Sequence, residues 1–253
     1  MISVIVATKL RPSLQTLLSS LRQQSLIYGK EWELLTRSDG INEYDARNKA
    51  AREAKGELFA FLDDDTYVDS DYLEKGKRHF EDAKIMVMDC ALKGNFFGHG
   101  EEVIDKHGWG IGATLWVRRE AFEKVGGFEA TWQLNPRPRG WRSDTDLLWR
   151  IMDAYGDDSY YHADDMIVYH PSPGGSSWDV RVEKLFYLRH KERCLKLFLP
   201  VDPRLCQLVI AVDDDPVARA AAQRHLDEFI AAGLLTRELA TESIKALRAW
   251  TQE

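Results

Sequence analysis

Three consecutive aspartates, Asp63, Asp64 and Asp65, are the residues of this sequence whose type and spacing most directly suggest chemistry. They follow the apolar run Leu58 to Leu62, which has the composition of a buried strand. Adjacent carboxylates repel one another, so either solvent screens them in a loop or a bound cation neutralises them. Residues two apart point the same way from an extended chain, so Asp63 and Asp65 could bind one divalent cation.

Three kinds of site could use such a cluster. An EF-hand calcium loop counted from Asp63 fails at Tyr67 and Val68, where a ligand and a glycine are needed. An aspartate-nucleophile phosphatase also places Asp-x-Asp after an apolar strand, although it usually has Thr or Val at the position of Tyr67. A nucleotide-sugar site needs hard oxygen ligands at a strand end, where they hold a cation on the diphosphate.

The elements around the cluster alternate between strand and helix. Strands are predicted over Ile2–Ala7, Trp32–Leu35 and Leu58–Leu62, with a helix around Leu14–Leu21 and another over Ala46–Lys55 that Asp45 caps. This order predicts an α/β fold with a mainly parallel sheet flanked by helices. Ligands of such sheets bind beyond the carboxyl ends of the strands, where Thr8, Asp39 and the three aspartates lie.

The second half of the chain predicts further elements and a helical extension. Strands are expected over Gly112–Val117 and Met166–Tyr169, and helices over Arg119–Val125, from about Thr145, over Trp178–Leu199, from Pro216 to Ala232 and from Thr236 to Trp250. The composition changes near Pro200. The prediction is therefore a catalytic domain over residues 1–200 and a C-terminal helical hairpin over 201–253.

Composition narrows the class of protein. The 253 residues carry 41 acids against 34 bases, a net charge of −7 that disfavours a general nucleic-acid binder. No apolar run is long enough for a signal peptide or a membrane span. The three cysteines are unpatterned, as in a reducing compartment, so a cytoplasmic protein is expected.

Three segments in register resemble family 2 glycosyltransferases of the GT-A (Rossmann-like) fold, over about residues 1–175. They are SVIVATKLRPSL, ARNKAAREAKGELFAFLDDD, and GATLWVRREAFEKVGGF followed by GWRSDTDLLWR. The resemblance implies a metal-dependent enzyme that moves a sugar, with inversion, from a nucleoside diphosphate sugar to an acceptor hydroxyl. Because Leu10, Ser38 and Ser143 depart from the family pattern, a degenerate module that only binds the nucleotide-sugar is the alternative.

The resemblance also implies roles for single residues. Asp144 matches the general base, although Ser143 and Asp144 could equally cap the helix that follows. Asp146 is expected to support that helix or the acceptor pocket. The metal, Mn²⁺ or Mg²⁺, is assigned to Asp63, Asp65 and His170, and the nucleotide-sugar to Thr8, Arg11, Asp39, Arg47, Asp63 and Asp64. The competing interpretations are a turn residue for Asp39, a surface ion pair for Arg47 and a plain loop residue for His170.

The acceptor is not identified by any motif. Residues 95–113 and 131–141 stand where the family has acceptor loops, and His99 and His107 within the first are expected to face solvent. The basic, apolar segment Trp178–Lys196 suits either a peripheral contact with an anionic membrane or a helix packed on the catalytic domain. The C-terminal helices are expected to pack on that domain or to form a homo-oligomer.

Overall fold

The computed structural model describes residues 1–94, 102–105, 107–133, 142–171 and 179–250. The chain forms two compact units, Met1–Ser177 and Trp178–Glu253, and each is described by itself. The basic segment after residue 178, which the sequence analysis placed in the catalytic domain, is part of the C-terminal unit.

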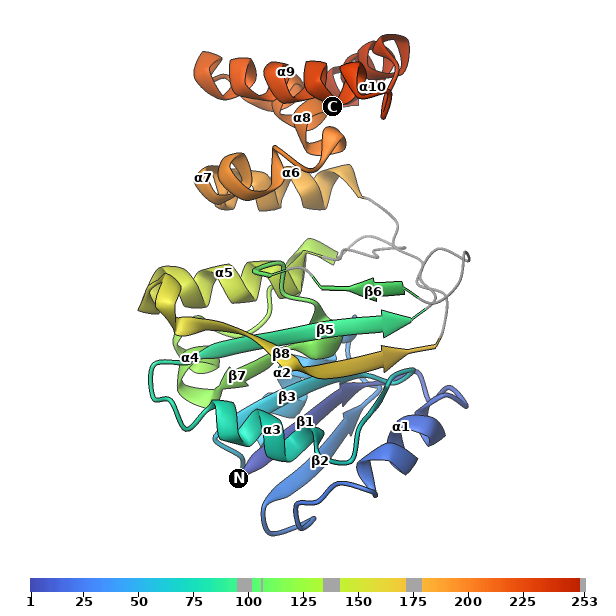
Figure 1. Cartoon of the computed structure of the whole chain (residues 1–253), viewed down its shortest axis with the longest axis vertical. Coiled ribbons are helices and arrows are strands. Elements are labelled where there is room, and N and C mark those ends of the chain that lie inside the picture. Colours follow the sequence, from blue (N-terminus) through green and yellow to red (C-terminus); the bar gives the residue numbers. More distant parts are fainter. Residues whose placement is uncertain (95–101, 106, 134–141, 172–178, 251–253) are drawn as a thin grey trace. The chain divides into compact units, whose positions relative to one another are not determined.

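The N-terminal unit is built on one eight-stranded sheet (Figure 1). Its order is β2-β1-β3-β7-β5-β8-β4, with β6 paired to β5. Parallel pairing joins β1 to β2 and β3, and β5 to β8, whereas β7, β4 and β6 pair antiparallel. The strands are β1 Ile2–Ala7, β2 Trp32–Arg37, β3 Leu58–Asp63, β4 Tyr67–Val68, β5 Val87–Gly94, β6 Glu102–Ile104, β7 Trp116–Arg118 and β8 Tyr160–His170. The predicted α/β fold class is confirmed.

Alternate residues of the central strands face two helical layers. Val4 and Leu62 lie in the core with buried residues of α1 (Leu14–Leu21) and α3 (Tyr72–His79). The opposite face carries an aromatic cluster that includes α2 (Glu43–Glu53) and α4 (Arg119–Lys124). Its rings, 4.8 to 6.2 Å apart between neighbouring centroids, are those of Tyr44, Phe59, Phe61, Phe122 and Phe128.

Two predicted helix starts are wrong. Helix α2 begins at Glu43, because extended Asn42 accepts a hydrogen bond from the Asp45 amide at 2.9 Å. Asp45 instead accepts from the amide of Ile41, the residue before the N-cap, at 3.0 Å. Helix α5 (Ser143–Tyr155) starts two residues before the predicted Thr145, with Arg142 as its N-cap residue.

Two predicted strands also differ from the structure. Residues Gly112–Thr114 form a 3-10 turn, η1, closed by a 2.8 Å hydrogen bond from the Thr114 amide to the Ile111 carbonyl. Only the end of the predicted strand, from Trp116, joins the sheet. Strand β8 begins at Tyr160, well before the predicted Met166, because residues 160–163 pair with the first half of β5 and residues 167–170 with its second half.

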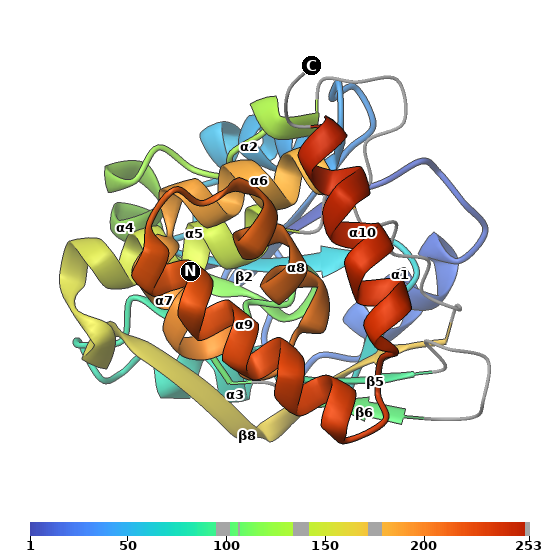
Figure 2. The ribbon, with the colours of Figure 1, turned by 90° about the horizontal axis from the view of Figure 1, so that it is seen from above.

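The C-terminal unit contains more helices than predicted. The expected single helix over Trp178–Leu199 breaks at His190 into α6 and α7, and a π-helical turn follows. Asp215 caps α9 and Pro216 is its first residue, as predicted, and α8 packs against both α9 and α10 (Figures 1 and 2). The elements are α6 Val180–Arg189, α7 Lys191–Arg193, η4 Cys194–Phe198, α8 Pro203–Val212, α9 Pro216–Ala231 and α10 Arg237–Trp250.

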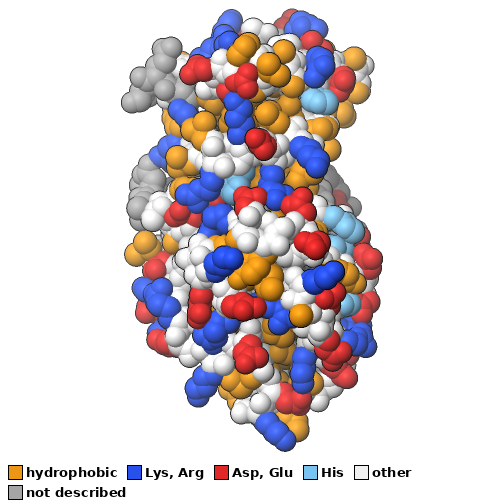
Figure 3. Space-filling model, turned by 90° about the vertical axis from the view of Figure 1, so that its left-hand side faces the viewer, with side chains coloured by type: hydrophobic (Ala, Val, Ile, Leu, Met, Phe, Trp, Pro, Cys, Tyr) orange, Lys and Arg blue, Asp and Glu red, His pale blue; other side chains and the backbone are white. Residues whose placement is uncertain are grey.

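The surface carries both signs of charge. On the face in Figure 3, acidic and basic side chains are intermixed over the N-terminal unit, without a continuous basic area among the described side chains. Among the residues described, no helix has the length and hydropathy required to cross a membrane.

Candidate active site

The three aspartates diverge toward different partners at the carboxyl end of β3. Asp64 points toward the loop after β1, where it accepts hydrogen bonds from Thr8 Oγ1 at 2.7 Å and the Lys9 amide at 3.0 Å. Thr8 Oγ1 in turn accepts from the Leu10 amide at 2.8 Å. Thr8 and Asp64 are both buried, so these two predicted nucleotide contacts join the β1 and β3 loops to each other.

Asp65 lies between a guanidinium and an imidazole. Its Oδ2 is 2.9 Å from Arg11 Nη1, and its Oδ1 is 3.3 Å from His170 Nε2. Burial tends to raise the pKa of Asp65, but His170 and Arg11 outweigh this effect and hold the pKa below its ordinary value. The carboxylate is therefore ionised and offers an anionic ligand at neutral pH.

His170 reaches the aspartates through strand pairing. The antiparallel register pairs Tyr67 of β4 with Tyr169 of β8, and their rings stack with centroids 4.7 Å apart. The residue after Tyr169 is thereby placed beside the turn that precedes β4. One ligand atom each from Asp63, Asp65 and His170 lie within 4.8 Å of one another. Two carboxylates and an imidazole form a donor set that fits Mn²⁺, and the carboxylates also suit Mg²⁺.

Arg47 is buried beneath this group. Its side chain is 2 % exposed, its Nη2 forms an ion pair with Asp63, and its guanidinium lies 5.6 Å from the centroids of both the Tyr44 and Phe128 rings. It belongs to the second turn of α2, because that helix begins at Glu43 and not at the predicted Ala46. Its Nε atom has no hydrogen-bond partner among the described residues. The burial of the Arg47 side chain argues against the surface ion pair that was considered for it. Arg47 instead orients the Asp63 carboxylate from below.

Asp144 does not cap α5 with its side chain. Its Oδ1 accepts a hydrogen bond from the Tyr44 hydroxyl, and its Oδ2 accepts from the Gly112 amide at 2.8 Å. Burial raises the pKa of Asp144 to about 6, against the lowering effects of the Tyr44 hydrogen bond and the Arg47 charge. A partly buried carboxylate with this pKa is suited to accept a proton near neutral pH.

Gly112 shows how closely this site is packed. A Cβ atom on Gly112 would lie 2.8 Å from Asp144 Oδ2 and 2.9 Å from Arg47 Nη1, closer than side-chain carbons tolerate. Arg47 therefore approaches both Asp63 and Asp144, and it connects the group of metal-ligand candidates with the candidate base.

Tyr44 and Gly112 were not among the site residues predicted from the sequence. The spacing of Tyr44 and Arg47, three residues apart on a helix, could have indicated a shared face. No local sequence pattern could have indicated the contact between Gly112 and Asp144, because it depends on how η1 packs against α5.

Other predicted residues lie outside this network. The Asp39 carboxylate is exposed and its ionic contact is with Arg37, at 3.8 Å. Ser143 is buried and donates to the Glu129 carbonyl at 2.9 Å, whereas buried Asp146 pairs with Arg150 at 2.7 Å. His99 and residues 134–141 of the expected acceptor loops lie outside the described part of the chain.

Comparisons with known proteins agree with this architecture. Residues 42–128, which include Arg47, the aspartates and Gly112, match the family model for glycosyl transferase family 2. A search of curated proteins gave no significant match.

Solved structures match over nearly the whole chain. A fragment of S. aureus TarS in complex with UDP-GlcNAc matches with a TM-score of 0.62 and 17% identity, covering 98% of this chain and 89% of that one. A mannosyltransferase from Pyrobaculum calidifontis, in complex with GDP-Man and Mn²⁺, has a TM-score of 0.57 at 16% identity, covering 100% and 88%. GalNAc-T7 with UDP, GalNAc and Mn²⁺ has a TM-score of 0.56 at 12% identity, covering 91% and 56%. The predicted family resemblance and the GT-A fold are confirmed.

Proposed function

We propose that this chain, a glycosyltransferase of the GT-A fold, is a metal-dependent, inverting enzyme that uses a nucleoside diphosphate sugar. The observation that carries the proposal is the position of Asp144, held by Tyr44 and Gly112 and approached by the same arginine that pairs with Asp63. A base and a group of metal-ligand candidates thus share one buried cation, Arg47.

The donor end of the site is proposed at the carboxyl ends of β1 and β3. Asp63, Asp65 and His170 would hold Mn²⁺ or Mg²⁺, which supplies charge stabilisation for the leaving diphosphate when it is bound. Arg11, whose side chain is half exposed, is the cation that we assign to the diphosphate. Asp39, exposed after β2, is kept as the proposed contact for the base of the nucleotide.

The acceptor end is proposed at Asp144. Its carboxylate removes the proton of the acceptor hydroxyl while the oxygen forms a bond to the anomeric carbon and the bond from that carbon to the diphosphate breaks. Tyr44 and Gly112 hold the carboxylate in one orientation through its two oxygens. Attack from the face opposite the leaving group gives inversion.

The alternatives are weaker on this structure. The EF-hand alternative is excluded, because a strand precedes the aspartates and β4 follows them. The family match and the fold favour transfer over the aspartate-nucleophile phosphatase. The remaining alternative is a module that binds the donor without transferring the sugar. Measurements of donor binding and of transfer distinguish it from an active enzyme.

The role of the C-terminal unit is a separate proposal. It contains none of the proposed site residues, and exposed Leu185 and Leu188 on α6 alternate with basic side chains. We propose that this unit serves placement at an anionic membrane surface or assembly in the cytoplasm, not chemistry.

Asp144→Asn tests the proposed mechanism. The amide can keep both contacts, since Nδ2 can donate to the Tyr44 oxygen while Oδ1 accepts from the Gly112 amide. We expect turnover to fall by roughly 10² to 10⁴ with donor affinity nearly unchanged. The matched control is Asp153→Asn, an exposed carboxylate of the same helix, which should leave turnover unchanged.

The pH profile gives a second measurement on the same variant. Asp144 must be ionised to accept a proton, and its pKa is raised to about 6. The value of kcat/KM of the wild type should therefore rise as pH increases through about 6, whereas the residual rate of the Asn variant lacks this step. A folded Asn variant that binds donor and transfers sugar at the wild-type rate would exclude Asp144 as the base. Donor binding by a wild type that transfers to no acceptor would favour the binding module.

A further inference from the structure

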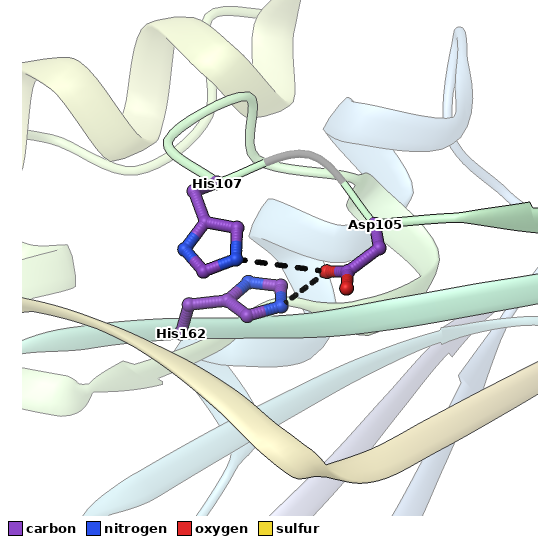
Figure 4. A group of neighbouring side chains, drawn as sticks. All are labelled: Asp105, His107 and His162. Atoms are coloured by element: carbon purple, nitrogen blue, oxygen red, sulfur yellow. Dashed lines mark ion pairs between the residues drawn. The ribbon is translucent and has the colours of Figure 1, made fainter.

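A second group of metal-ligating side chains lies at the other end of β5 and β8, away from the proposed active site. It consists of Asp105, His107 and His162, one ligand atom from each lying within 4.8 Å of the others. Figure 4 shows both imidazoles directing a ring nitrogen toward the same Asp105 oxygen. The distances to that oxygen, Oδ1, are 2.6 Å from His162 Nε2 and 3.8 Å from His107 Nε2.

His162 is oriented by a buried carboxylate. The parallel register pairs Asp89 of β5 with His162 of β8, and Asp89 Oδ1 lies 2.7 Å from His162 Nδ1. The same carboxylate accepts from the Tyr160 hydroxyl at 2.7 Å and the Gly110 amide at 3.3 Å, so its orientation is set by the protein. Metal-binding histidines commonly donate their second ring nitrogen to a carboxylate in this way, which leaves the other nitrogen as the ligand.

Among the described residues, none is in hydrogen-bonding geometry with the remaining ring nitrogen of His162. His162 is 8 % exposed, and its Nε2 is buried without a partner in hydrogen-bonding geometry. The Asp105 oxygen is close enough, at 2.6 Å, but lies off the direction in which that nitrogen would donate. When Nδ1 donates to Asp89, the Nε2 of a neutral imidazole turns its lone pair toward the Asp105 oxygen, which is unfavourable unless a proton or a metal cation lies between the two atoms.

The backbone of β8 brings another carboxylate to the same place. The β5–β8 register shifts after Cys90, so that residues 164–166 of β8 bulge out of the pairing. Asp164 within this bulge has its Oδ1 3.9 Å from His162 Nε2. Zn²⁺ prefers four ligands of this kind. The set would consist of the two imidazoles, the Asp105 carboxylate, and either the Asp164 carboxylate or a water molecule.

We propose that Asp105, His107 and His162 bind a transition-metal dication, with Zn²⁺ as the fitting ion and Asp89 as the residue that orients His162. The side chain of His107 is 62 % exposed, in agreement with the expectation that it faces solvent, and the proposal adds a ligand role for its Nε2, which is directed into this group. The inference does not rest on the proposed transferase mechanism.

The proposed role of the ion is to hold the loop that begins with Asp105. Along this loop, the Gly108 amide donates to the Tyr160 hydroxyl at 2.7 Å and the Gly108 carbonyl accepts from Trp149 Nε1 at 2.8 Å. The loop leads into Gly112, whose amide donates to Asp144. An ion bound at Asp105 and His107 would fix the start of this loop, and Asp144 lies at its end.

The test measures metal binding in a protein whose first group of candidate ligands is disrupted by the loss of Asp65. Full-length Asp65→Ala protein, stripped with a chelator, is titrated with Zn²⁺ by calorimetry and with Co²⁺ by visible absorption. We expect one Zn²⁺ per chain, and a Co²⁺ spectrum typical of a four-coordinate ion with nitrogen and oxygen ligands. Adding His107→Ala or Asp105→Asn, both changes of exposed side chains, should weaken Zn²⁺ binding by at least roughly 100-fold.

The matched control is His79→Ala in the same Asp65→Ala background. His79 Nε2 lies 2.6 Å from Asp165 Oδ1, so it is also a histidine paired with an aspartate, but it belongs to no group of three ligands in the described part of the chain. This variant should bind Zn²⁺ as tightly as its parent. Zn²⁺ should also raise the Tm of the parent and of the His79 variant but not that of the His107 variant.

Two results would overturn the proposal. One is an Asp65→Ala protein that binds no Zn²⁺, because His162 is then an imidazolium held between Asp89 and Asp105. The other is Zn²⁺ binding that survives both His107→Ala and Asp105→Asn, because the ion then lies elsewhere. Since every arm lacks Asp65, neither result depends on whether the chain transfers sugar.

Discussion

At the scale of single residues, the three aspartates show how adjacent carboxylates can coexist without a bound ion. Asp63 pairs with Arg47, Asp64 with the β1 loop through Thr8, and Asp65 with Arg11. Each carboxylate is thus stabilised by a cation or by hydrogen bonds, and repulsion alone does not require a metal. His170 favours a metal site instead, because strand pairing places its imidazole beside the carboxylates of Asp63 and Asp65.

The first prediction concerns Asp65. Asp65→Ala removes one proposed metal ligand in the turn after β3, outside the apolar core, so transfer should fall by roughly 10³-fold while Tm changes little. Asp69→Ala, an exposed aspartate four residues further along, is the control and should retain full activity. Transfer and Mn²⁺ binding are measured together. Wild-type transfer by Asp65→Ala at saturating Mn²⁺ would disprove the ligand assignment.

The second prediction concerns backbone strain in the β1 loop. Leu10 has φ of 58°, the one positive φ at a non-glycine residue among those described, and its side chain is 70% exposed. Leucine pays a steric cost in this left-handed region, which asparagine tolerates. Leu10→Asn should therefore raise the free energy of unfolding by about 1 kcal/mol.

Urea unfolding followed by tryptophan fluorescence measures this change. Ile41→Asn is the control, because Ile41 is 71% exposed and has no positive φ to relieve. A Leu10→Asn protein no more stable than the wild type would show that the loop bears no such strain.

At the scale of elements, short-range packing between a turn and a helix sets the orientation of the candidate base. The η1 turn brings the Gly112 amide to Asp144, in the first turn of α5, and α2 brings Tyr44 from the other side. Asp144 is thereby held by two elements that are distant in sequence from its own helix. Neither contact is a helix cap, so mutations that only weaken the cap should leave the base in place.

Gly112→Ala tests this arrangement. The added methyl would meet Asp144 Oδ2 at 2.8 Å and Arg47 Nη1 at 2.9 Å, so the turn must move away from α5. We expect turnover to fall by roughly 10-fold or more and the free energy of unfolding to fall by about 1–3 kcal/mol. Gly108→Ala is the control on the same loop, since its Cβ meets no atom within 4 Å although its φ is 75°. It should lose stability but keep turnover; equal turnover in both variants would contradict the proposed packing.

At the scale of the whole molecule, the described site residues all belong to the N-terminal unit. The C-terminal unit has its own buried residues, such as Phe186 on α6 and Leu208 on α8. A network of Tyr187, Lys191, Asp213 and Asp215 ties α6 and α7 to the start of α9. Because the site residues all lie in the N-terminal unit, we expect donor binding to depend on that unit alone.

The last prediction is that residues 1–177 fold alone and bind donor. The fragment keeps every proposed donor contact, so its affinity for UDP or GDP in the presence of Mn²⁺ should be within about threefold of that of the full chain. Circular dichroism and calorimetry measure folding and binding. A cut at residue 215 is a poor substitute, because it exposes the face of α8 that packs on α9 and α10. A folded fragment without nucleotide affinity would place part of the donor site in the C-terminal unit.

The sequence by itself determined the features that depend on local order. The apolar strands β1 to β3, the helices between them and the aspartates at the end of β3 could all be predicted, because period and turn chemistry are properties of neighbouring residues. The motif order was enough to indicate the fold class and the family resemblance, and to select Asp144 and His170 as candidates. The start of β7, the start of β8 and helix α8 were not predicted, since pairing and packing decide them.

Only the tertiary structure decided which side chains meet. Tyr44 and Asp144 are 100 residues apart, and Asp89 and His162 are 73 apart, so no local pattern relates them. The contact between Asp89 and His162 exists because β5 and β8 pair in parallel in one register, and a slip by one residue would turn both side chains to the opposite face. Asp64 links two loops and His107 is a ligand candidate for the same reason. The burial and the contacts of a side chain depend on the tertiary fold, whereas the sequence gives only the type of residue.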